Sequence, residues 1–139
     1  MRHRVSGNNL RRKTSHRLAM LKNLATSLIQ YKKIRTTLAK AKALRPYVEK
    51  VITKAKNDKS FSSVKSLKIR LGSDYAVKTL LTDLAPQYAP KQGGYTRIIK
   101  LPARPGDNAL MARIELIDLR PIKKAAKITG DKTKKEVSA

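Results

Sequence analysis

The chain of 139 residues contains no cysteine and no tryptophan, and aromatic residues make up only 4% of it. The lack of cysteine excludes disulfides, thiol nucleophiles, iron–sulfur clusters and thiolate zinc sites. Modules that splay single-stranded bases across a sheet need exposed aromatic side chains, and five Tyr and one Phe supply few of them. The composition therefore favours phosphate contact and shape recognition over base stacking.

Acidic residues are also scarce, and none occurs before Glu49. The first 48 residues contain thirteen Lys and Arg, and the whole chain has 33 basic and 9 acidic residues, a formal net charge of +24. Such an excess is typical of proteins that bind nucleic acid. The acids are scattered, and no P-loop, catalytic triad or metal-binding carboxylate cluster is found. We expect no enzymatic activity, no cofactor, no metal and no small-molecule substrate.

Long apolar runs are missing as well. No stretch approaches the roughly 18 to 20 residues of a membrane span, and no short apolar segment with a small-residue cleavage site follows the N-terminus. The Arg-rich start is similar to an organelle transit peptide, but such peptides are usually longer and richer in Ser. We expect a cytoplasmic protein with no membrane partner.

Four apolar patterns with helical spacing follow one another along the chain. They predict helices over residues 14–31, 38–56, 61–71 and 74–84. Thr14 or Ser15 can cap the first helix, Thr37 can cap the second, and Phe61 belongs to the apolar side of the third. Pro46 predicts a kink or a break in the second helix, because proline removes a hydrogen bond and disfavours the α region at the residue before it.

Three β-branched and partly alternating stretches predict strands over residues 33–37, 95–101 and 111–119, the first of them at a sheet edge. In the last strand, Ile114 and Leu116 would lie on one side and Arg113 and Glu115 on the other. Residues 102–108 form a hairpin connection with a mobile, basic tip. The elements predict an α+β fold in two layers, with about four helices packed on one face of a small three-stranded sheet.

The globular domain is expected to span residues 14–120, between two charged extensions. Residues 1–13 form a basic arm whose only sizeable aliphatic side chains are Val5 and Leu10, so the arm cannot build a core and is expected to become ordered on a partner. Residues 121–139 are Lys-rich and have little to bury, which predicts a disordered or partner-ordered tail.

Six blocks follow one another along the chain: MRHRVSG at 1–7, TSHR at 14–17, NLATSLI at 23–29, TTLAKAK at 36–42, LRPYVEK at 44–50 and GGYTRI at 93–98. Together they resemble the bacterial ribosomal protein L17 family, over residues 1 to 119. The resemblance implies a component of the large ribosomal subunit that binds 23S rRNA near the peptide exit region, beside neighbours such as ribosomal protein L32. Asn8, Asn9 and Pro105 stand where many members carry basic residues. Asparagine can hydrogen-bond a phosphate or a ribose, but it releases no counterion.

Cationic side chains in and after the arm are the main candidates for RNA contact. Arg is preferred to Lys because its planar fork can bond two phosphate oxygens at once. His3 and His16 could hydrogen-bond or stack on RNA, and Tyr95 is the one tyrosine expected to do so, because Gly93 and Gly94 would let an RNA backbone approach. The candidates are Arg2, His3, Arg4, Asn8, Asn9, Arg11, Arg12, Lys13, His16, Arg17, Lys22, Lys32, Lys33, Arg35, Lys40, Arg45, Tyr95, Arg97 and Arg104.

Two other classes of protein share the high charge. A nucleoid or architectural DNA-binding protein is the main alternative, but the chain has neither a helix-turn-helix signature nor coiled-coil heptads for dimerisation. A nucleic-acid-processing enzyme would need clustered Asp, Glu or His for metal or acid–base chemistry. The ordered blocks favour the rRNA-binding protein over both.

Overall fold

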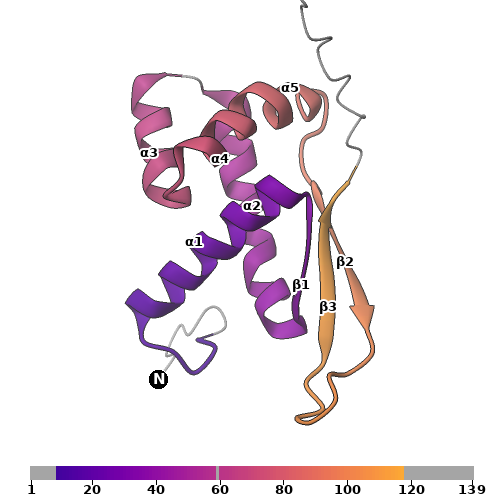
Figure 1. Cartoon of the computed structure of the whole chain (residues 1–139). Helices are drawn as coiled ribbons and strands as arrows, with labels where there is room; N and C mark the ends of the chain where they lie inside the picture. The colour runs from indigo at the N-terminus through magenta and orange to yellow at the C-terminus, as the bar shows by residue number, and fades with distance from the viewer. Residues whose placement is uncertain (1–8, 59, 118–139) are drawn as a thin grey trace, which may run out of the picture.

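Helices form most of the first two thirds of the chain, and a hairpin of two strands follows them (Figure 1). The computed structural model describes residues 9–58 and 60–117. The predicted tail and residues 1–8 of the arm lie outside this part. The elements are α1 (Thr14–Tyr31), β1 (Lys33–Thr37), α2 (Leu38–Asn57), α3 (Phe61–Leu71), α4 (Asp74–Thr79), the π-helical turn η1 (Leu80–Leu84), α5 (Ala85–Gln87), β2 (Thr96–Leu101) and β3 (Met111–Leu116).

The three strands form one antiparallel sheet in the order β1-β3-β2. β1 is an edge strand, as predicted, and the last strand in the sequence lies in the centre. The register places Arg35 opposite Arg113, and Ile114 between Ile34 and Ile98. Residues near position 35 and position 113 are thereby brought together, although most of the helical part separates them in the sequence.

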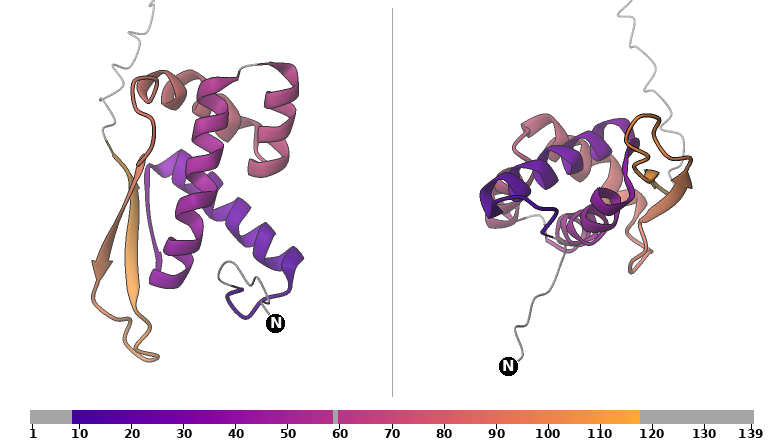
Figure 2. Two further views of the ribbon diagram at one scale, coloured as in Figure 1. Left: turned by 180° about the vertical axis from the view of Figure 1, so that it is seen from behind. Right: turned by 90° about the horizontal axis from the view of Figure 1, so that it is seen from below.

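All the helices lie on one side of the sheet, which gives the predicted α+β fold in two layers (Figures 1 and 2). The alternation along β3 agrees with the prediction, since Ala112, Ile114 and Leu116 are buried against the helices and the residues between them are not. The core continues into α1 and α2, where Leu28 and Leu44 are fully buried. Burying one such side chain contributes about 1.5 to 3 kcal/mol.

Neither of the two long helices begins with a side-chain cap. The predicted cap of α1 is wrong: the N-cap residue is Lys13, and Thr14 and Ser15 lie in the first turn. Thr37 occupies the N-cap position of α2 as predicted, but its hydroxyl accepts no hydrogen bond from the helix. Neither helix has an acidic residue in its first turn, so the positive end of each helix dipole is not neutralised by a carboxylate.

α2 continues through Pro46, so the predicted alternative of two separate helices is wrong. Pro46 is exposed, whereas Leu44, Val48 and Val51 on both sides of it are fully buried. An interior proline costs about 3 kcal/mol, and the burial of several aliphatic side chains exceeds this cost. Tertiary packing therefore keeps the helix in one piece.

The ends of the two following helical segments have local causes. α3 ends at Gly72, as predicted, with a φ angle of 68° that favours glycine. At its start, Phe61 is 85% exposed and does not join the core as predicted. In η1 the Ala85 N–H donates to the Leu80 carbonyl, one residue further back than in an α-helix. This wide turn comes directly before Pro86, which has no N–H to continue an α-helical ladder.

Candidate nucleic-acid interface

The sheet face turned away from the helices carries most of the sheet's charge. We call it the outer face; its side chains are those of Lys33, Arg35, Thr37, Arg97, Ile99, Leu101, Met111, Arg113 and Glu115, in three cross-strand rows. Four of these residues are cations and one is a carboxylate. No described helix covers this face (Figures 1 and 2).

Glu115 lies in the middle of one row and binds two of the arginines. It accepts hydrogen bonds from Arg97 Nη2 at 2.6 Å and Nε at 3.0 Å, and its Oε2 lies 3.3 Å from Arg113 Nε. The hydrogen bond from Arg97 and then the positive charges of Arg97, Arg113 and Lys33 hold the pKa of Glu115 below its ordinary value. The carboxylate is therefore ionised at neutral pH, and the outer face still has a net positive charge.

The described end of the arm turns back onto the start of α1. The Arg17 guanidinium donates to the side-chain oxygen of Asn9, and Arg12 Nη1 donates to His16 Nε2 at 2.8 Å. Since a guanidinium can only donate, His16 Nε2 is the acceptor in this pair. Four of the predicted RNA-contacting residues thus bind one another in this structure.

Four of the predicted residues are exposed cations for which no ion pair is found within residues 9–58 and 60–117: Arg11, Lys13, Lys33 and Arg35. The first two lie beside the start of α1 and the other two on β1. Figure 2 shows the start of α1 and the sheet on opposite sides of the molecule. The cationic side chains therefore form two separate basic regions.

Three further predicted residues, Lys22, Lys32 and Arg45, lie close to other parts of the fold. The Lys32 ammonium is buried and, among the described residues, has no hydrogen-bond partner; burial lowers its pKa, against the charge of Asp83. Lys22 lies over Gly72, with its Cε where a Cβ would stand, at the end of α3. Arg45 pairs with Glu49 one turn later in α2, at 3.4 Å. Lys40 is half-buried near the start of α2.

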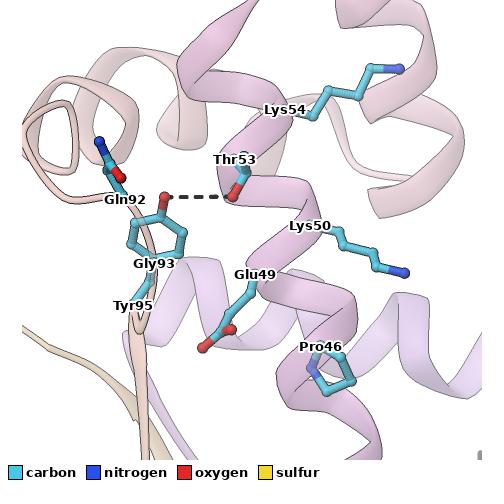
Figure 3. A pocket seen from close by; sticks show the side chains of 8 residues that line it. All are labelled: Pro46, Glu49, Lys50, Thr53, Lys54, Gln92, Gly93 and Tyr95. Carbon is cyan, nitrogen blue, oxygen red and sulfur yellow. Dashed lines mark hydrogen bonds between the residues drawn. The ribbon is translucent and has the colours of Figure 1, made fainter.

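Tyr95 is fully buried, so the prediction that it contacts RNA is wrong. Its ring packs against Tyr88 with a centroid distance of 5.0 Å, and its hydroxyl donates to the Lys91 carbonyl at 3.2 Å and accepts from Thr53 at 3.5 Å (Figure 3). The ring follows the turn at Gly93 and Gly94, where Gly94 has a φ angle of 62°, and it lies inside the fold. A buried ring offers no surface on which a base can stack.

A recess of about 460 Å³ lies beside Tyr95, between α2 and the segment before β2. Figure 3 shows the Lys50 and Lys54 side chains pointing away from Tyr95, while Glu49 points toward the strand that carries Tyr95. Glu49 accepts from Thr96 at 3.1 Å, and Lys54 donates to Ser66 at 2.8 Å. The recess thus has no concentration of free cations and does not resemble a phosphate site.

The hairpin tip is less basic than the sequence suggested. Arg104 binds Asp107 through two parallel hydrogen bonds, Nε to Oδ1 at 3.0 Å and Nη2 to Oδ2 at 2.5 Å, and Asp107 also accepts from the Ala109 N–H. Arg104 is therefore paired with a carboxylate of its own loop. Its guanidinium would have to exchange the carboxylate for a phosphate to contact RNA.

Arg104→Ala is expected to raise the pKa of Asp107 from about 2 toward its ordinary 3.8, because the guanidinium hydrogen bonds are the largest cause of the shift. A lowered pKa favours the ionised, paired form, so in the unaltered protein the contribution of the pair is fully present above pH 3.8 and is lost as the pH falls through about 2. NMR titration of the Asp107 carboxyl measures the shift. Arg104→Lys, which keeps the charge but not the fork, should give an intermediate value; an unchanged pKa in the Ala variant would contradict this account.

The described part of the chain offers neither a metal site nor a membrane-spanning helix. Within residues 9–58 and 60–117, no three His, Asp or Glu side chains are grouped as metal ligands. In the same ranges, no helix has both the length and the apolarity needed to cross a bilayer.

Arg113 is the interface residue that the sequence-based prediction missed. Its alternation with Ile114 placed it correctly on the outer side of its strand. Its importance depends on the cross-strand position of Arg35, which the sequence alone does not reveal.

Comparisons with a family model and with individual known proteins all lead to the same family. The family model described as "Ribosomal protein L17" matches residues 20–117. The large ribosomal subunit protein bL17 of Orientia tsutsugamushi (strain Boryong) is 53% identical over 118 residues, which cover 85% of this chain and 81% of that protein. The bL17 protein of Wolbachia pipientis subsp. Culex pipiens (strain wPip) is 55% identical over 119 residues (85% and 84%), and that of Flavobacterium johnsoniae 48% over 143 residues (97% and 87%).

The matched region contains every described strand and all of the helical part except the first turns of α1. The identities are far above what a shared fold alone would need. The chain therefore belongs to the ribosomal protein L17 family, and it is a structural protein of the large ribosomal subunit and not an enzyme.

Proposed function

We propose that this ribosomal protein binds 23S rRNA through phosphate and shape contacts near the peptide exit region, beside neighbours such as ribosomal protein L32. As a ribosomal protein it acts in translation, within a cytoplasmic ribonucleoprotein. The location and the named neighbour are those that the family resemblance implies. The observation that carries the RNA contact is the excess of exposed cations without an ion pair, at the start of α1 and on β1, in a chain of net charge +24.

The mode of binding follows from the side chains present. Long cationic side chains reach phosphates and 2′-hydroxyls, which are the groups that A-form RNA displays to a protein. Three aromatic rings, those of Tyr31, Phe61 and Tyr75, are exposed in the described part of the chain, and Tyr88 and Tyr95 are buried, so the exposed cations outnumber the rings that could stack on bases. Contacts to the phosphate backbone fix the position of a protein on its nucleic acid without reading base sequence. The fold of the rRNA would therefore supply the specificity.

Removal of residues 1–8 is expected to weaken incorporation into the large subunit and to leave the domain folded. The deletion takes away Arg2, His3 and Arg4 but keeps Asn9, which holds Arg17 at the start of α1. Binding energy should fall because fewer phosphate counterions are released. The fraction of the protein that co-sediments with large subunits through high salt measures the effect.

Circular dichroism melting of the same variant is the control for folding. A variant that melts like the intact protein and still co-sediments to the same extent would show that residues 1–8 are not the principal contact. Co-sedimentation of the intact protein that is lost in moderate salt would argue against the ribosomal role itself and for a loosely bound nucleic-acid partner.

A further inference from the structure

Arg35 and Arg113 are directly opposite each other on the outer face, in the edge strand and the central strand. Side chains in such a pair have their Cβ atoms about 4.5 to 5.5 Å apart, and like charges there destabilise a sheet. Glu115 does not relieve Arg35, because its two carboxylate oxygens lie against Arg97 and Arg113. The pair therefore costs stability in the free protein, and an anion between the two guanidinium groups would remove that cost.

A recess of about 260 Å³ opens at this pair. Its lining consists of Lys33, Ile34, Arg35 and Arg113, so three of its four residues are cations. The Nε atom of Arg113 is buried and, among the described residues, has no hydrogen-bond acceptor: Glu115 Oε2 forms an ion pair with it at 3.3 Å, but no hydrogen bond joins the two groups. A donor left without an acceptor in a cationic recess fits an anionic oxygen from outside the chain.

The rest of the outer face indicates how far this basic region extends. Toward the hairpin, the row formed by Thr37, Met111 and Leu101 contains no charge, and Ile99 completes the row of Arg35 and Arg113. The cations thus occupy the half of the face that is nearer the start of β1. Their density and the recess fit a phosphodiester backbone, whereas a protein neighbour would bury the apolar half.

This basic half lies on the opposite side of the molecule from the start of α1, which continues into the arm (Figure 2). A side chain spans a few ångströms, so one phosphate cannot be shared between the two regions. Each region must contact its own stretch of nucleic acid.

We propose that the basic half of the outer face is a second RNA-binding surface, in which Lys33, Arg35 and Arg113 hold an RNA phosphate, so that the protein joins two separate segments of rRNA. This inference rests on the proposed function and names a second contact for it. The protein would then hold two RNA segments together, with the arm bound to one segment and the sheet bound to the other.

The test uses the full chain and 23S rRNA, with hydroxyl-radical probing of the RNA backbone. The variant combines Lys33→Gln and Arg35→Gln, because both side chains are exposed and make no ion pair in the described structure. The matched control combines Lys65→Gln and Lys78→Gln, two exposed cations on α3 and α4 with the same total charge change. The intact protein should protect two separate backbone segments. The sheet variant should lose one of them and keep the other, and the control should keep both.

The salt dependence of affinity gives a second readout. Loss of this phosphate contact should reduce the slope of log affinity against log salt by about 0.9 in the sheet variant, by the duplex DNA relation. An equal loss in the control variant would indicate non-specific charge and would overturn the proposal, as would an unchanged footprint in the sheet variant. Crosslinking of the outer face to a ribosomal protein instead of RNA would overturn it in favour of a protein neighbour. Absence of any protection by the intact protein would reject the proposed function itself.

Discussion

The affinity of the intact protein for 23S rRNA is expected to fall by about 10³- to 10⁵-fold between about 50 and 200 mM salt, the loss that six to ten phosphate contacts produce. The two basic regions supply exposed cations without ion pairs, and the sequence before residue 9 adds Arg2 and Arg4. Each phosphate that is neutralised releases condensed counterions, and added salt opposes that release. Filter binding at several salt concentrations measures the slope.

A change of the anion in the salt provides the control. Replacement of chloride by glutamate at equal concentration should leave the cation dependence in place, because the ions released from RNA are cations. An affinity that is nearly independent of salt would reject the electrostatic mechanism. It would indicate that apolar or base-specific contacts dominate, through exposed side chains such as Leu18, Tyr31 and Phe61.

Tyr95→Ala is expected to lower the free energy of unfolding by about 3 to 5 kcal/mol, the range for removal of a large buried aromatic side chain. Tyr95 has no exposed surface, packs on Tyr88 and has its hydroxyl bonded to the Lys91 carbonyl. The substitution would leave a cavity and remove the aromatic pair. Urea denaturation followed by circular dichroism measures the change.

Tyr95→Phe is the matched comparison, because it keeps the ring and removes only the hydroxyl. Its cost should be about 1 kcal/mol, that of one hydrogen bond, and its affinity for RNA should equal that of the intact protein. If Tyr95→Phe weakened RNA binding without affecting stability, the hydroxyl would have to reach the RNA, and the structural role assigned to Tyr95 would be wrong.

The helices and strands could be predicted because their apolar periodicities are long and unbroken. The patterns at residues 14–31 and 61–71 agree with α1 and α3 at both ends. The continuation of α2 through Pro46 could not be predicted in the same way. Local geometry favours a kink or a break at proline, and only the depth to which Leu44 and Val48 are buried shows that packing outweighs it.

The positive charge of the candidate site could be predicted from the sequence, but which residues lie together there could not. Exposed cations at Arg11, in the basic arm, and Arg35, on a predicted edge strand, follow from composition and strand alternation. Lys32 looks the same in the sequence, yet its ammonium is buried, and the residue has the left-handed backbone conformation that ends α1. Arg113 required the strand register, which is set by contacts between residues far apart in the chain. The burial of Tyr95 could be predicted only with knowledge of the direction that the chain takes after the turn at Gly93 and Gly94.

The strand order also sets a sequence of events during synthesis. β1 is made early, but its only described partner is β3, which ends at Leu116. Pairings between such distant residues form late, because the intervening chain must first be produced and brought together. The arm and α1 emerge from the translating ribosome long before Arg113 can meet Arg35. Under the proposed two-surface binding, a newly made copy would be tethered to RNA through its first residues while its second surface does not yet exist, and completion of the sheet would turn a single attachment into two.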